Sequence, residues 1–532
     1  MRPTHLALLL FLSVGLSAQT SLNIALKSQT TYLNDMNDIW GYTSASGREF
    51  ALGGTTAGVS IVEVSSPANP TKKQFIQGPY SIWRDLKTWD HYAYVTHDNT
   101  FAWNTVPDHG LLIIDLDSID NATPTFKTMN PVIQTPLGSM DTLQTAHNLY
   151  IDENGYAYLF GANVGNGGAL IFDVATDPWN PTYVGMYDDY YFHDGMVRGD
   201  TIWGSAVYQG KFVVVDASLK DSTVVLATHG TPNAFTHNTW ISDDNSVLFT
   251  TDEIGDAFLT AYDVSDLTNI TELDRIQASL GTSVIPHNAH VNGQWVVTSY
   301  YTAGVQIVDA KYPELLVEVG FYDTSPSFSG NGFYGNWGAY PYFESDAIIC
   351  SDIEEGLFVL EPTYVEASRV HVVVYDSITR APLSNADIVF DIASDTLQSS
   401  IDGLANAGTH LDVLDSISVK LAGFVPHKSA YQWQAGIFDT LKVALLNVNN
   451  VGMQDAAHAA IVLQPNPNSG TFQLTGVENG RYQLMDASGR RLEEGLLSKD
   501  WITLKNKYAH GTYYLRVQWG SQAKTFPVML LP

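Results

Sequence analysis

The sequence predicts an all-β chain: a seven-bladed β-propeller followed by two small β-sandwich domains. Three observations support this fold class. A short pattern recurs seven times between Met36 and Pro362, each copy holds about four strand-like segments, and the repeat stops after Pro362. A period of roughly 40–50 residues with about four short strands is typical of a propeller blade.

Each copy opens on a pair of polar or aromatic residues and later reaches a Gly that precedes an apolar run. Successive pairs are 44 to 63 residues apart. The apolar runs, such as ALIFDV and VQIVDA, do not alternate with polar residues, so we expect both of their faces to be covered. The seven opening pairs are Trp40-Gly41, Arg84-Asp85, His147-Asn148, His193-Asp194, His237-Asn238, His287-Asn288 and Trp337-Gly338.

The third copy displays the elements of a blade most clearly. Asn154-Gly155 provides a turn in which Gly accepts a positive φ angle. Pro178 and Pro181 interrupt the chain before the last strand, because proline has no N–H to donate to a neighbouring strand. The expected strands are residues 147–152, 156–161, 169–174 and 182–187.

The last copy has one strand too few. Residues 336–361 contain only three strand-like segments before Pro362. Residues 22–29 precede the first pair and belong to no copy, so we expect them to pair as the outer strand of the final blade. A ring closed in this way leaves only short, protected strand edges. A frayed N-terminus is the alternative.

The first residues predict export. Residues 1–18 have the features of a secretory signal peptide, with Arg2, an apolar run from Leu6 to Leu16, and Ser17-Ala18 before the cleavage point. That run is too short to span a bilayer, and no later stretch reaches about 18 apolar residues. We therefore expect no transmembrane helix, and an exported protein that is soluble or is tethered by something other than a helix; the C-terminal resemblance given below implies passage through the periplasm to the medium or the outer cell surface.

The excess of acidic residues limits the classes of molecule that the protein can bind. The chain has 56 acidic and 26 basic residues, a formal net charge of −30. Such a surface repels phosphate backbones, so we expect no nucleic-acid partner. The charge suits divalent cations or saline surroundings, and the solubility of an exported protein is the simpler explanation. The single Cys350 lies in an apolar run, so we expect a buried thiol.

The propeller is one of five predicted segments. Residues 369–447 contain alternating strands such as RVHVVVYD and SISVKLAG, which are typical of a small sandwich. This segment resembles carboxypeptidase-regulatory-like and prealbumin-like accessory modules, which implies a spacer or interaction module. The predicted bounds are 1–18 for the signal peptide, 19–363 for the propeller, 364–447 for the sandwich, 448–460 for a linker and 461–532 for a C-terminal domain.

The C-terminal segment carries three motifs in order: PNPNSGTF at residues 465–472, DASGR at 486–490 and GTYYLRV at 511–517. Together they closely resemble the C-terminal sorting domain of the type IX secretion system of Bacteroidetes. The resemblance implies that residues 461–532 engage that secretion machinery and are usually removed, after which the passenger is released or joined to surface polysaccharide. The final residues, TFPVMLLP, depart from the family pattern because they are less basic.

A second resemblance covers the repeat region. The runs LLIIDL, ALIFDV and VQIVDA resemble the bacterial LVIVD repeat. Together with SIWRD, AHNLYID, PHNAHV and GNWGAYPYF, they make residues 21–362 similar to the choice-of-anchor B family of secreted proteins. Members of that family share the repeat region and differ in how the C-terminus attaches to the cell. The resemblance implies architecture and address, and it assigns no biochemical activity.

Propeller topology gathers the candidate site residues at one rim. The innermost strand of a blade starts at one face of the ring, and the loop between its second and third strands returns to that face. The opening pairs should therefore encircle the channel, with these loops beside them. The candidate ligand-binding residues are Arg84, Asp85, His147, Asn148, His193, Asp194, His237, Asn238, His287, Asn288, Asp252, Glu253 and Asp352, with Asp98, Asn163, His290 and Glu354 nearby.

Imidazoles and carboxylates that converge on one rim can bind a divalent metal, with calcium, zinc and manganese as the candidates. No compact motif such as H-E-x-x-H is present, and His287 and His290 should point to opposite faces of their strand. The alternative is that these groups hydrogen-bond neighbouring strands, because buried polar groups need partners. The candidate metal ligands are His147, His193, His237, His287 and Glu253.

Three functions remain open. The first is a secreted or surface-held module that binds a ligand, a glycan or a surface protein through this rim. The second is a metal-dependent hydrolase or lyase that uses acid–base pairs at the rim. The third is a structural surface protein with no small-molecule site. The sequence contains no G-x-S-x-G, Walker or dinucleotide-binding motif, so it identifies no catalytic residue and favours a non-enzyme.

Overall fold

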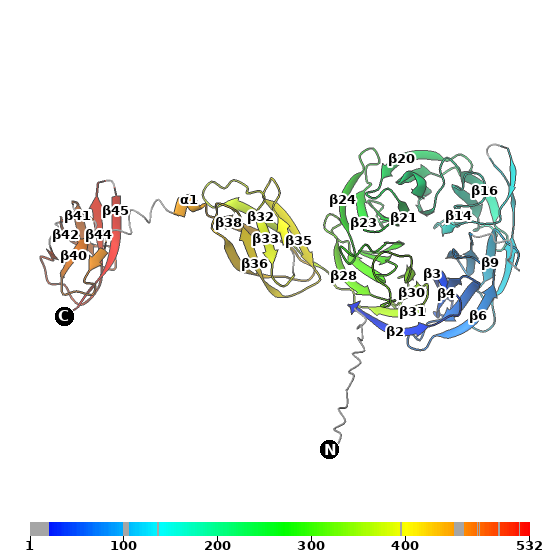
Figure 1. Cartoon of the computed structure of the whole chain (residues 1–532), viewed down its shortest axis with the longest axis horizontal. Helices are drawn as coiled ribbons and strands as arrows, with labels where there is room; N and C mark the ends of the chain where they lie inside the picture. Colours follow the sequence, from blue (N-terminus) through cyan, green and yellow to red (C-terminus); the bar gives the residue numbers. More distant parts are fainter. Residues whose placement is uncertain are drawn as a thin grey trace, which may run out of the picture. The chain divides into compact units, whose positions relative to one another are not determined.

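The computed structural model describes residues 21–98, 106–135, 138–393, 396–451, 462–475, 477, 479–497, 501–520 and 522–531. The predicted signal peptide and most of the predicted linker lie outside the described residues. Strands dominate the chain and form seven small sheets arranged in a ring, followed in sequence by two sandwiches (Figure 1). No helix within the described ranges is long and apolar enough to cross a membrane.

Each of the first four blades is one antiparallel sheet whose strands run outward from the channel in chain order. Blade 1 comprises β3 (Met36–Thr43), β4 (Glu49–Thr55), β5 (Gly58–Glu63) and β6 (Thr71–Gln77). Blade 2 comprises β7 (Leu86–Trp89), β8 (Tyr92–Val95), β9 (Leu111–Asp115) and β10 (Thr125–Met129). Blade 3 comprises β13 (Asn148–Ile151), β14 (Tyr156–Phe160), β15 (Ala169–Asp173) and β16 (Thr182–Tyr187). Blade 4 comprises β17 (Asp194–Arg198), β18 (Thr201–Ala206), β19 (Lys211–Asp216) and β20 (Val224–Gly230), with the 3₁₀ turn η1 (Val207–Gln209) between β18 and β19.

The last three blades complete the ring. Blade 5 comprises β21 (Thr236–Ile241), β22 (Val247–Asp252), β23 (Leu259–Asp263) and β24 (Thr271–Ile276). Blade 6 comprises β25 (Ala289–Asn292), β26 (Trp295–Ser299), β27 (Val305–Asp309) and β28 (Val317–Tyr322). Blade 7 comprises β29 (Asn336–Tyr340), β30 (Ile348–Asp352), β31 (Gly356–Pro362) and the N-terminal β2 (Ile24–Thr30).

The N-terminal segment closes the ring, as the short last copy predicts. β2 pairs antiparallel with β31, from Ile24 opposite Pro362 to Thr30 opposite Leu357. In Figure 1 the blue β2 lies beside β31, which comes more than 300 residues later. The preceding two-residue strand β1 (Ser21–Leu22) instead extends blade 6 by pairing with β28. The N-terminus therefore fastens two blades.

An additional hairpin follows the last strand of blade 2, which explains why this copy of the repeat is longer than the others. β11 (Val132–Gln134) and β12 (Met140–Thr142) form a separate two-stranded sheet between β10 and blade 3. The sequence analysis did not predict this hairpin. Its strands have only three residues each, too short for the alternating pattern that identifies a strand in a sequence.

The hydrophobic core lies between neighbouring blades. Tyr94 of blade 2 packs in one cluster with Leu149 and Leu159 of blade 3, and all three side chains are fully buried. The third strands contribute Leu111, Ile113, Leu170 and Phe172 to this cluster. Cys350 belongs to the cluster between blades 6 and 7 and is fully buried, which confirms the expected buried thiol.

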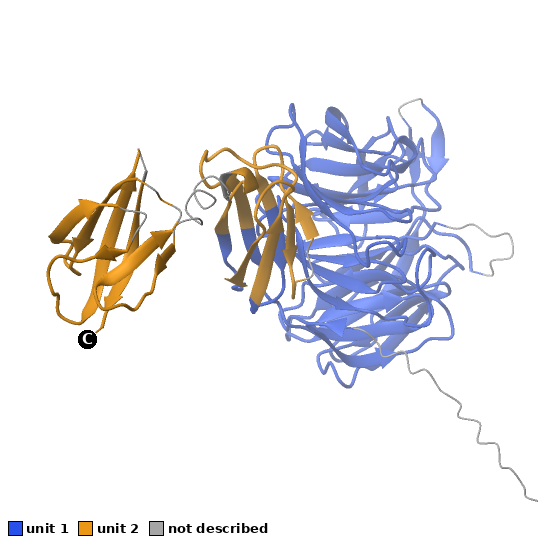
Figure 2. Cartoon of the chain, turned by 60° about the vertical axis from the view of Figure 1, so that its left-hand side comes forward, with its two compact units in different colours: residues 1–370, 406–414, 432–439 blue, residues 371–405, 415–431, 440–532 orange. Residues whose placement is uncertain are grey.

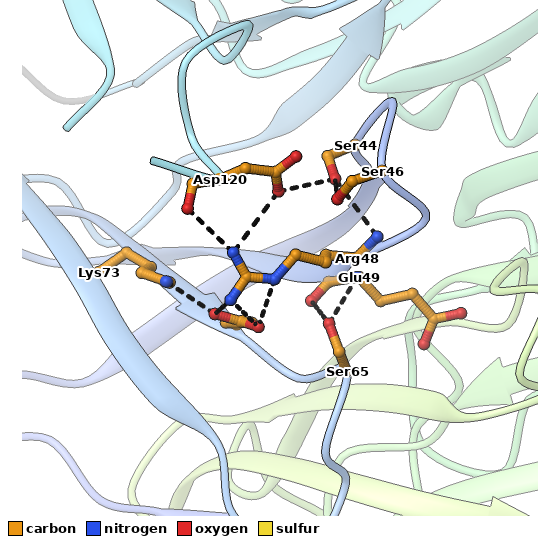
Figure 3. A network of polar contacts seen from close by, with 8 residues as sticks. Ser44, Ser46, Arg48, Glu49, Ser65, Lys73 and Asp120 are labelled. Atoms are coloured by element: carbon orange, nitrogen blue, oxygen red, sulfur yellow. Dashed lines mark hydrogen bonds and ion pairs between the residues drawn. The ribbon is translucent and has the colours of Figure 1, made fainter. Parts of the chain in front are cut away.

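An ion network joins blade 1 to blade 2 (Figure 3). The Arg48 guanidinium donates to both carboxylate oxygens of Glu63, at 2.9 and 2.8 Å, and to the backbone carbonyl of Asp120, at 2.9 Å. The Lys73 ammonium lies 2.7 Å from Glu63. Burial raises the pKa of Glu63, but Lys73 and Arg48 outweigh burial and hold that pKa below its ordinary value. The carboxylate is therefore ionised at neutral pH.

Two sandwiches follow the propeller in sequence. The first has sheets in the orders β35-β32-β38 and β34-β33-β36-β37, and the second has sheets in the orders β39-β40-β43 and β42-β41-β44-β45. The first contains β32 (Ser368–Asp376), β33 (Asp387–Phe390), β34 (Thr396–Gln398), β35 (Leu404–Thr409), β36 (Leu414–Lys420), β37 (His427–Gln432) and β38 (Phe438–Leu445). After the one-turn helix α1 (Val448–Val451), the second contains β39 (Val462–Gln464), β40 (Thr471–Thr475), β41 (Arg481–Met485), β42 (Arg491–Leu496), β43 (Ile502–Thr503), β44 (Gly511–Trp519) and β45 (Gln522–Leu530).

The chain divides into two compact units, coloured separately in Figure 2. The first comprises residues 1–370, 406–414 and 432–439, and the second comprises 371–405, 415–431 and 440–532. This division runs through the first sandwich. The domain bounds proposed in the sequence analysis stay a prediction.

Candidate functional site

The second residues of the opening pairs fasten neighbouring blades to one another. Asp85 accepts the backbone N–H of Leu86 on its own strand at 2.6 Å and that of Leu149 on the next blade at 2.9 Å. Asn238 spans two neighbours in the same way, donating to Asp194 at 2.9 Å and accepting the N–H of Ala289 at 3.1 Å. Asp85, Asp194 and Asn238 therefore hold the inner strands together, which is the structural alternative considered for this set.

The first opening pair is Asn37-Asp38, and the expected pair Trp40-Gly41 is wrong by three residues. Asp38 accepts the N–H of the following residue at 2.8 Å, as Asp85 does, and lies with Asp85 around the channel. Trp40 lies two residues further along its strand, where its ring centroid is 6.1 Å from that of His290. Because side chains alternate along a strand, Trp40 and His290 form a second layer below the opening pairs.

A buried ion cluster occupies the channel between these layers. Lys87 lies 2.7 Å from a carboxylate oxygen of Asp85 and 3.9 Å from one of Asp38, and all three side chains are less than a tenth exposed. Burial and the neighbouring Asp85 raise the pKa of Asp38 well above its ordinary value. Burial opposes ionisation of Asp85 too, but Lys87 holds the pKa of Asp85 below its ordinary value. Asp85 and Lys87 thus form the charged pair of this cluster.

Above this cluster, four histidines form an arc around the channel opening. The ring centroids of His147 and His193 are 4.0 Å apart, those of His193 and His237 are 4.5 Å apart, and those of His237 and His287 are 4.4 Å apart. Each comes from the start of an innermost strand, so four successive blades supply them. The structure brings together all four histidines that the sequence analysis named as metal ligands.

Two imidazoles of this arc, those of His193 and His287, avoid protonation. Burial lowers the pKa of His193 well below its ordinary value, and the neighbouring His147 and His237 lower it further. Burial has the same effect on His287, assisted by His237. His193 and His287 are therefore neutral at pH 7, and each has one ring nitrogen with a free lone pair. In the layer below, burial lowers the pKa of His290 to about 3.

Glu253 reaches the arc from the loop between β22 and β23, as the topology predicts. One of its carboxylate oxygens is 3.7 Å from Nε2 of His237, and the other is 3.9 Å from Nε2 of His287. Tyr301 donates its hydroxyl to Glu253 at 2.6 Å. One donor atom each from His193, His237 and Glu253 lie within 4.8 Å of one another, a spacing that can surround a metal ion.

The loop after β8 supplies a second carboxylate to the rim. Oδ2 of Asp98 lies 2.8 Å from Nδ1 of His147, and the indole ring of Trp83 lies 5.8 Å from that imidazole. Since a carboxylate only accepts, His147 donates its Nδ1–H to Asp98. The sequence analysis placed Asp98 near the site, and this contact shows what it does there.

Asp252 and Asp352 each hold the connection that enters their blade, which corrects the expectation that they belong to the ligand site. Asp252 accepts the hydroxyl of Thr231 at 2.6 Å and the backbone N–H of Phe235 at 3.0 Å. Asp352 accepts the hydroxyl of Thr324 at 2.6 Å. Both carboxylates are buried and fully engaged in shaping the connections between blades.

Arg84 also has a structural role, although it lies beside the opening. Its guanidinium donates to the backbone carbonyls of Thr55 at 3.1 Å and Pro79 at 2.5 Å, both in blade 1 or the connection that follows it. Burial lowers the pKa of Arg84 to about 10. The amides of Asn148 and Asn288, by contrast, line the small space beneath the histidines.

A cavity of about 420 Å³ opens above the arc. Its walls are mainly apolar and aromatic, and its polar wall includes His147, His193 and Glu253. Beneath it, a space of about 20 Å³ is bordered by all four histidines of the arc. The apolar walls comprise Met36, Ile82, Trp83, Tyr301, Phe333, Trp337 and Ile353.

The sequence analysis missed several of these residues. Asp38 was hidden by the misplaced first pair, and correct alignment of blade 1 with Arg84-Asp85 would have found it. Lys87 and Trp40 occupy the same place in their blades as His290, so the repeat register is the signal for them. Tyr301 and Phe333 lie outside the repeat motif, and no sequence signal identifies them.

The comparisons with known proteins concern the fold. No protein-family model matches the chain, and no curated protein matches it. Among solved structures, the chain is similar to the β-propeller domain of Cps50 (Swd1) from Myceliophteria thermophila, with 10% sequence identity and a TM-score of 0.43. The similarity covers 64% of this chain and 100% of that one. The strand pairing described above carries the assignment: this chain contains a β-propeller.

Proposed function

We propose that the protein is a binding module that takes up a small ligand, such as a glycan fragment, in the cavity above the histidine arc. The observation that carries this proposal is the cavity of about 420 Å³, which joins aromatic walls to a floor of imidazoles and a carboxylate. Ligand sites are typically concave spaces of about 300–1,000 Å³ with mainly apolar walls and a few convergent polar groups.

The walls favour a ligand with one flat, apolar face and one polar end. Trp337 and Phe333 offer aromatic surfaces, on which the C–H face of a sugar ring or another flat group can stack. The polar end would meet Glu253 and the imidazoles. Phe333 is 57% exposed, so its ring is accessible before a ligand arrives.

The test is a screen of glycan fragments and small organic acids, read out by thermal stability and by tryptophan fluorescence. We expect at least one class to raise the unfolding temperature, and Phe333→Ala to weaken its binding about tenfold, as loss of one aromatic contact does. Phe126→Ala is the matched control, because Phe126 is 48% exposed and lies on the outer strand β10. A screen with no hit would favour a structural surface protein.

The same proposal includes export. A signal-like segment at residues 1–18 and the three motifs between 465 and 517 support passage through the periplasm and then through a type IX system. In a Bacteroidetes host, deletion of residues 461–532 should retain the protein in the periplasm. Unchanged appearance of the truncated protein on the surface or in the medium would refute this part.

A metal-dependent hydrolase is the second candidate, and one observation favours it. Glu253 lies within 4 Å of His237 and His287, so a carboxylate and imidazoles surround a position open to the cavity. Such a set can activate a bound water. Hydrolysis of ester or glycoside probes that is lost in Glu253→Gln would support it, and a silent panel would leave binding as the function.

A further inference from the structure

We infer that His193, His237 and Glu253 bind a divalent first-row transition-metal ion at the floor of the cavity. Their donor atoms lie within 4.8 Å of one another, and they come from blades 4 and 5. The inference rests on the proposed function for its biological role, because the ion would be the group that a ligand's polar end meets. It rests on the geometry alone for its existence.

The separations between Glu253 and the neighbouring imidazoles are close to those of a filled site. Donor atoms about 2.1 Å from a tetrahedral ion lie about 3.4 Å apart. The carboxylate of Glu253 is 3.7 Å from Nε2 of His237 and 3.9 Å from Nε2 of His287. His237 and Glu253 would move by only a few tenths of an ångström to close on an ion, whereas the 4.8 Å bound on the set leaves a larger movement to His193. A space of about 20 Å³ already lies among the histidines.

Hydrogen bonds set the tautomer of the two outer histidines. Nδ1 of His287 lies 2.5 Å from the backbone carbonyl of Trp337, which can only accept, so the proton is on Nδ1 and the lone pair is on Nε2. His147 is arranged in the same way by Asp98. Donation of the second ring nitrogen to a carbonyl or carboxylate fixes the orientation of an imidazole, so His147 and His287 flank the proposed ligands as oriented rings.

The two central histidines have the opposite property. Nδ1 of His193 and Nδ1 of His237 are buried and have no hydrogen-bond partner among the described residues. A buried ring nitrogen without a partner is costly, because burial removes its hydrogen bond to water. Nε2 of His237 is the nitrogen that approaches Glu253, so an ion held there leaves Nδ1 of His237 to carry the proton, and only Nδ1 of His193 can gain a partner by binding the ion.

Tyr301 orients the carboxylate. Its hydroxyl donates to one oxygen of Glu253 at 2.6 Å, and the other oxygen is the one that approaches His237. The Tyr301 side chain is itself buried, so the contact is held by the surrounding packing. This support leaves Glu253 with a lone pair directed at the arc.

The donor set selects the class of ion. Imidazole nitrogens suit zinc, iron, nickel and copper, whereas calcium takes six to eight oxygen ligands. This site offers several nitrogens and a single carboxylate, so it fits a zinc-like ion and does not fit calcium. Two histidines and one carboxylate also leave coordination positions open toward the cavity.

The test uses the full exported chain, freed of metal by a chelator and then titrated with Zn²⁺ and Co²⁺. We expect one Zn²⁺ per chain by elemental analysis and calorimetry, and visible d–d absorption on addition of Co²⁺. Both His237→Ala and Glu253→Gln should weaken Zn²⁺ binding by about 100-fold or more, and Tyr301→Phe by about tenfold. His91→Ala is the control, because His91 lies outside the site, in the turn between β7 and β8 of blade 2, where it contacts Asp90.

Several results would overturn the inference. These are substoichiometric Zn²⁺, a Co²⁺ spectrum unchanged from that of the ion in water, or equal weakening by His91→Ala. Glu253→Gln guards against misfolding, because it keeps the shape of a partly exposed loop side chain. Repeating the ligand screen on metal-free protein separates the two proposals. Ligand binding by a protein that binds no metal would refute only the metal site, and metal binding by a protein that binds no ligand would refute only the proposed ligand site.

Discussion

Replacing Lys87 by Met should destabilise the propeller strongly at neutral pH and much less at mildly acidic pH. Lys87 lies 2.7 Å from Asp85 inside the channel, and both side chains are less than a tenth exposed. Met keeps the length and apolar stem of the side chain while it removes the charge. Asp85 would then be a buried carboxylate with no cation beside it.

The distance gives the scale of the effect. At an effective dielectric constant of about 20, unit charges 2.7 Å apart attract by about 6 kcal/mol. Part of that attraction already offsets the cost of burying both ions, so loss of one partner typically costs about 3–5 kcal/mol. We expect the free energy of unfolding of the propeller to fall by that amount at about pH 7.5.

The pH dependence follows from the pKa of Asp85. Lys87 holds that pKa below its ordinary value, so in the native protein Asp85 adds stability that is present above about pH 4 and lost as the pH falls through the folded-state pKa. Without Lys87, burial raises the pKa of Asp85 above its value in the unfolded chain. The variant therefore takes up a proton on folding, and its deficit shrinks toward about pH 5.

Urea unfolding followed by tryptophan fluorescence at both pH values measures the deficit. Lys127→Met is the control, because Lys127 is on the outer strand β10 and should change stability by less than about 0.5 kcal/mol. The double variant Asp85→Asn with Lys87→Met should recover much of the loss, since no unpaired charge remains. A deficit below about 1 kcal/mol, or one that does not change with pH, would refute the reasoning.

Three further predictions concern other parts of the ring. Gly356→Val should release the closing strand β2, because Gly356 has φ +99° and a Cβ there would lie 2.3 Å from the carbonyl of Thr30. We expect faster proteolysis near the N-terminus, and unchanged resistance to protease would contradict the prediction. Arg48→Ala should lower the free energy of unfolding by about 0.5–1 kcal/mol in low salt and by less in about 1 M NaCl, because the side chain is 37% exposed and salt screens its ion pairs. Urea midpoints measure the difference, and an equal loss at both salt concentrations would rule out an ionic origin. Cys350 should react with a thiol reagent only after unfolding, because burial raises its pKa to about 12; rapid labelling of the native protein would show that the thiol is accessible.

Much of the propeller could be predicted because a similar pattern of strands recurs from blade to blade of the sequence. The four strands of blade 3 occupy residues 148–151, 156–160, 169–173 and 182–187, within a residue or so of the expected bounds. Gly before each third strand and Pro after it recur in several copies, so errors in one copy are corrected by the others. The pairing of β2 with β31 followed from counting strands.

The errors have a physical origin in what a motif leaves undetermined. An aspartate at a strand end can face the channel or a neighbouring connection, and Asp252 accepts hydrogen bonds from the connection between β20 and β21 because Thr231 and Phe235 present donors there. Blade 1 was misaligned because Trp40-Gly41 resembles Trp337-Gly338 in sequence, although Asn37-Asp38 occupies the corresponding place. The contact between Tyr301 and Glu253 joins two blades, and single-copy contacts of this kind leave no repeated trace.

Closure by the N-terminal strand determines when the ring can close during synthesis and folding of the chain. Lys27 on β2 and Glu361 on β31 form an ion pair across 334 positions of the chain, so almost the whole repeat region must exist before the two can meet. Contacts between such distant segments form late, since a long loop must first be ordered. Until then blade 7 lacks its outer strand and β2 has nowhere to dock. A nascent chain interrupted anywhere before Pro362 would therefore stay open and sensitive to proteases. The ring can close only after β31 has been synthesised and is able to pair with β2.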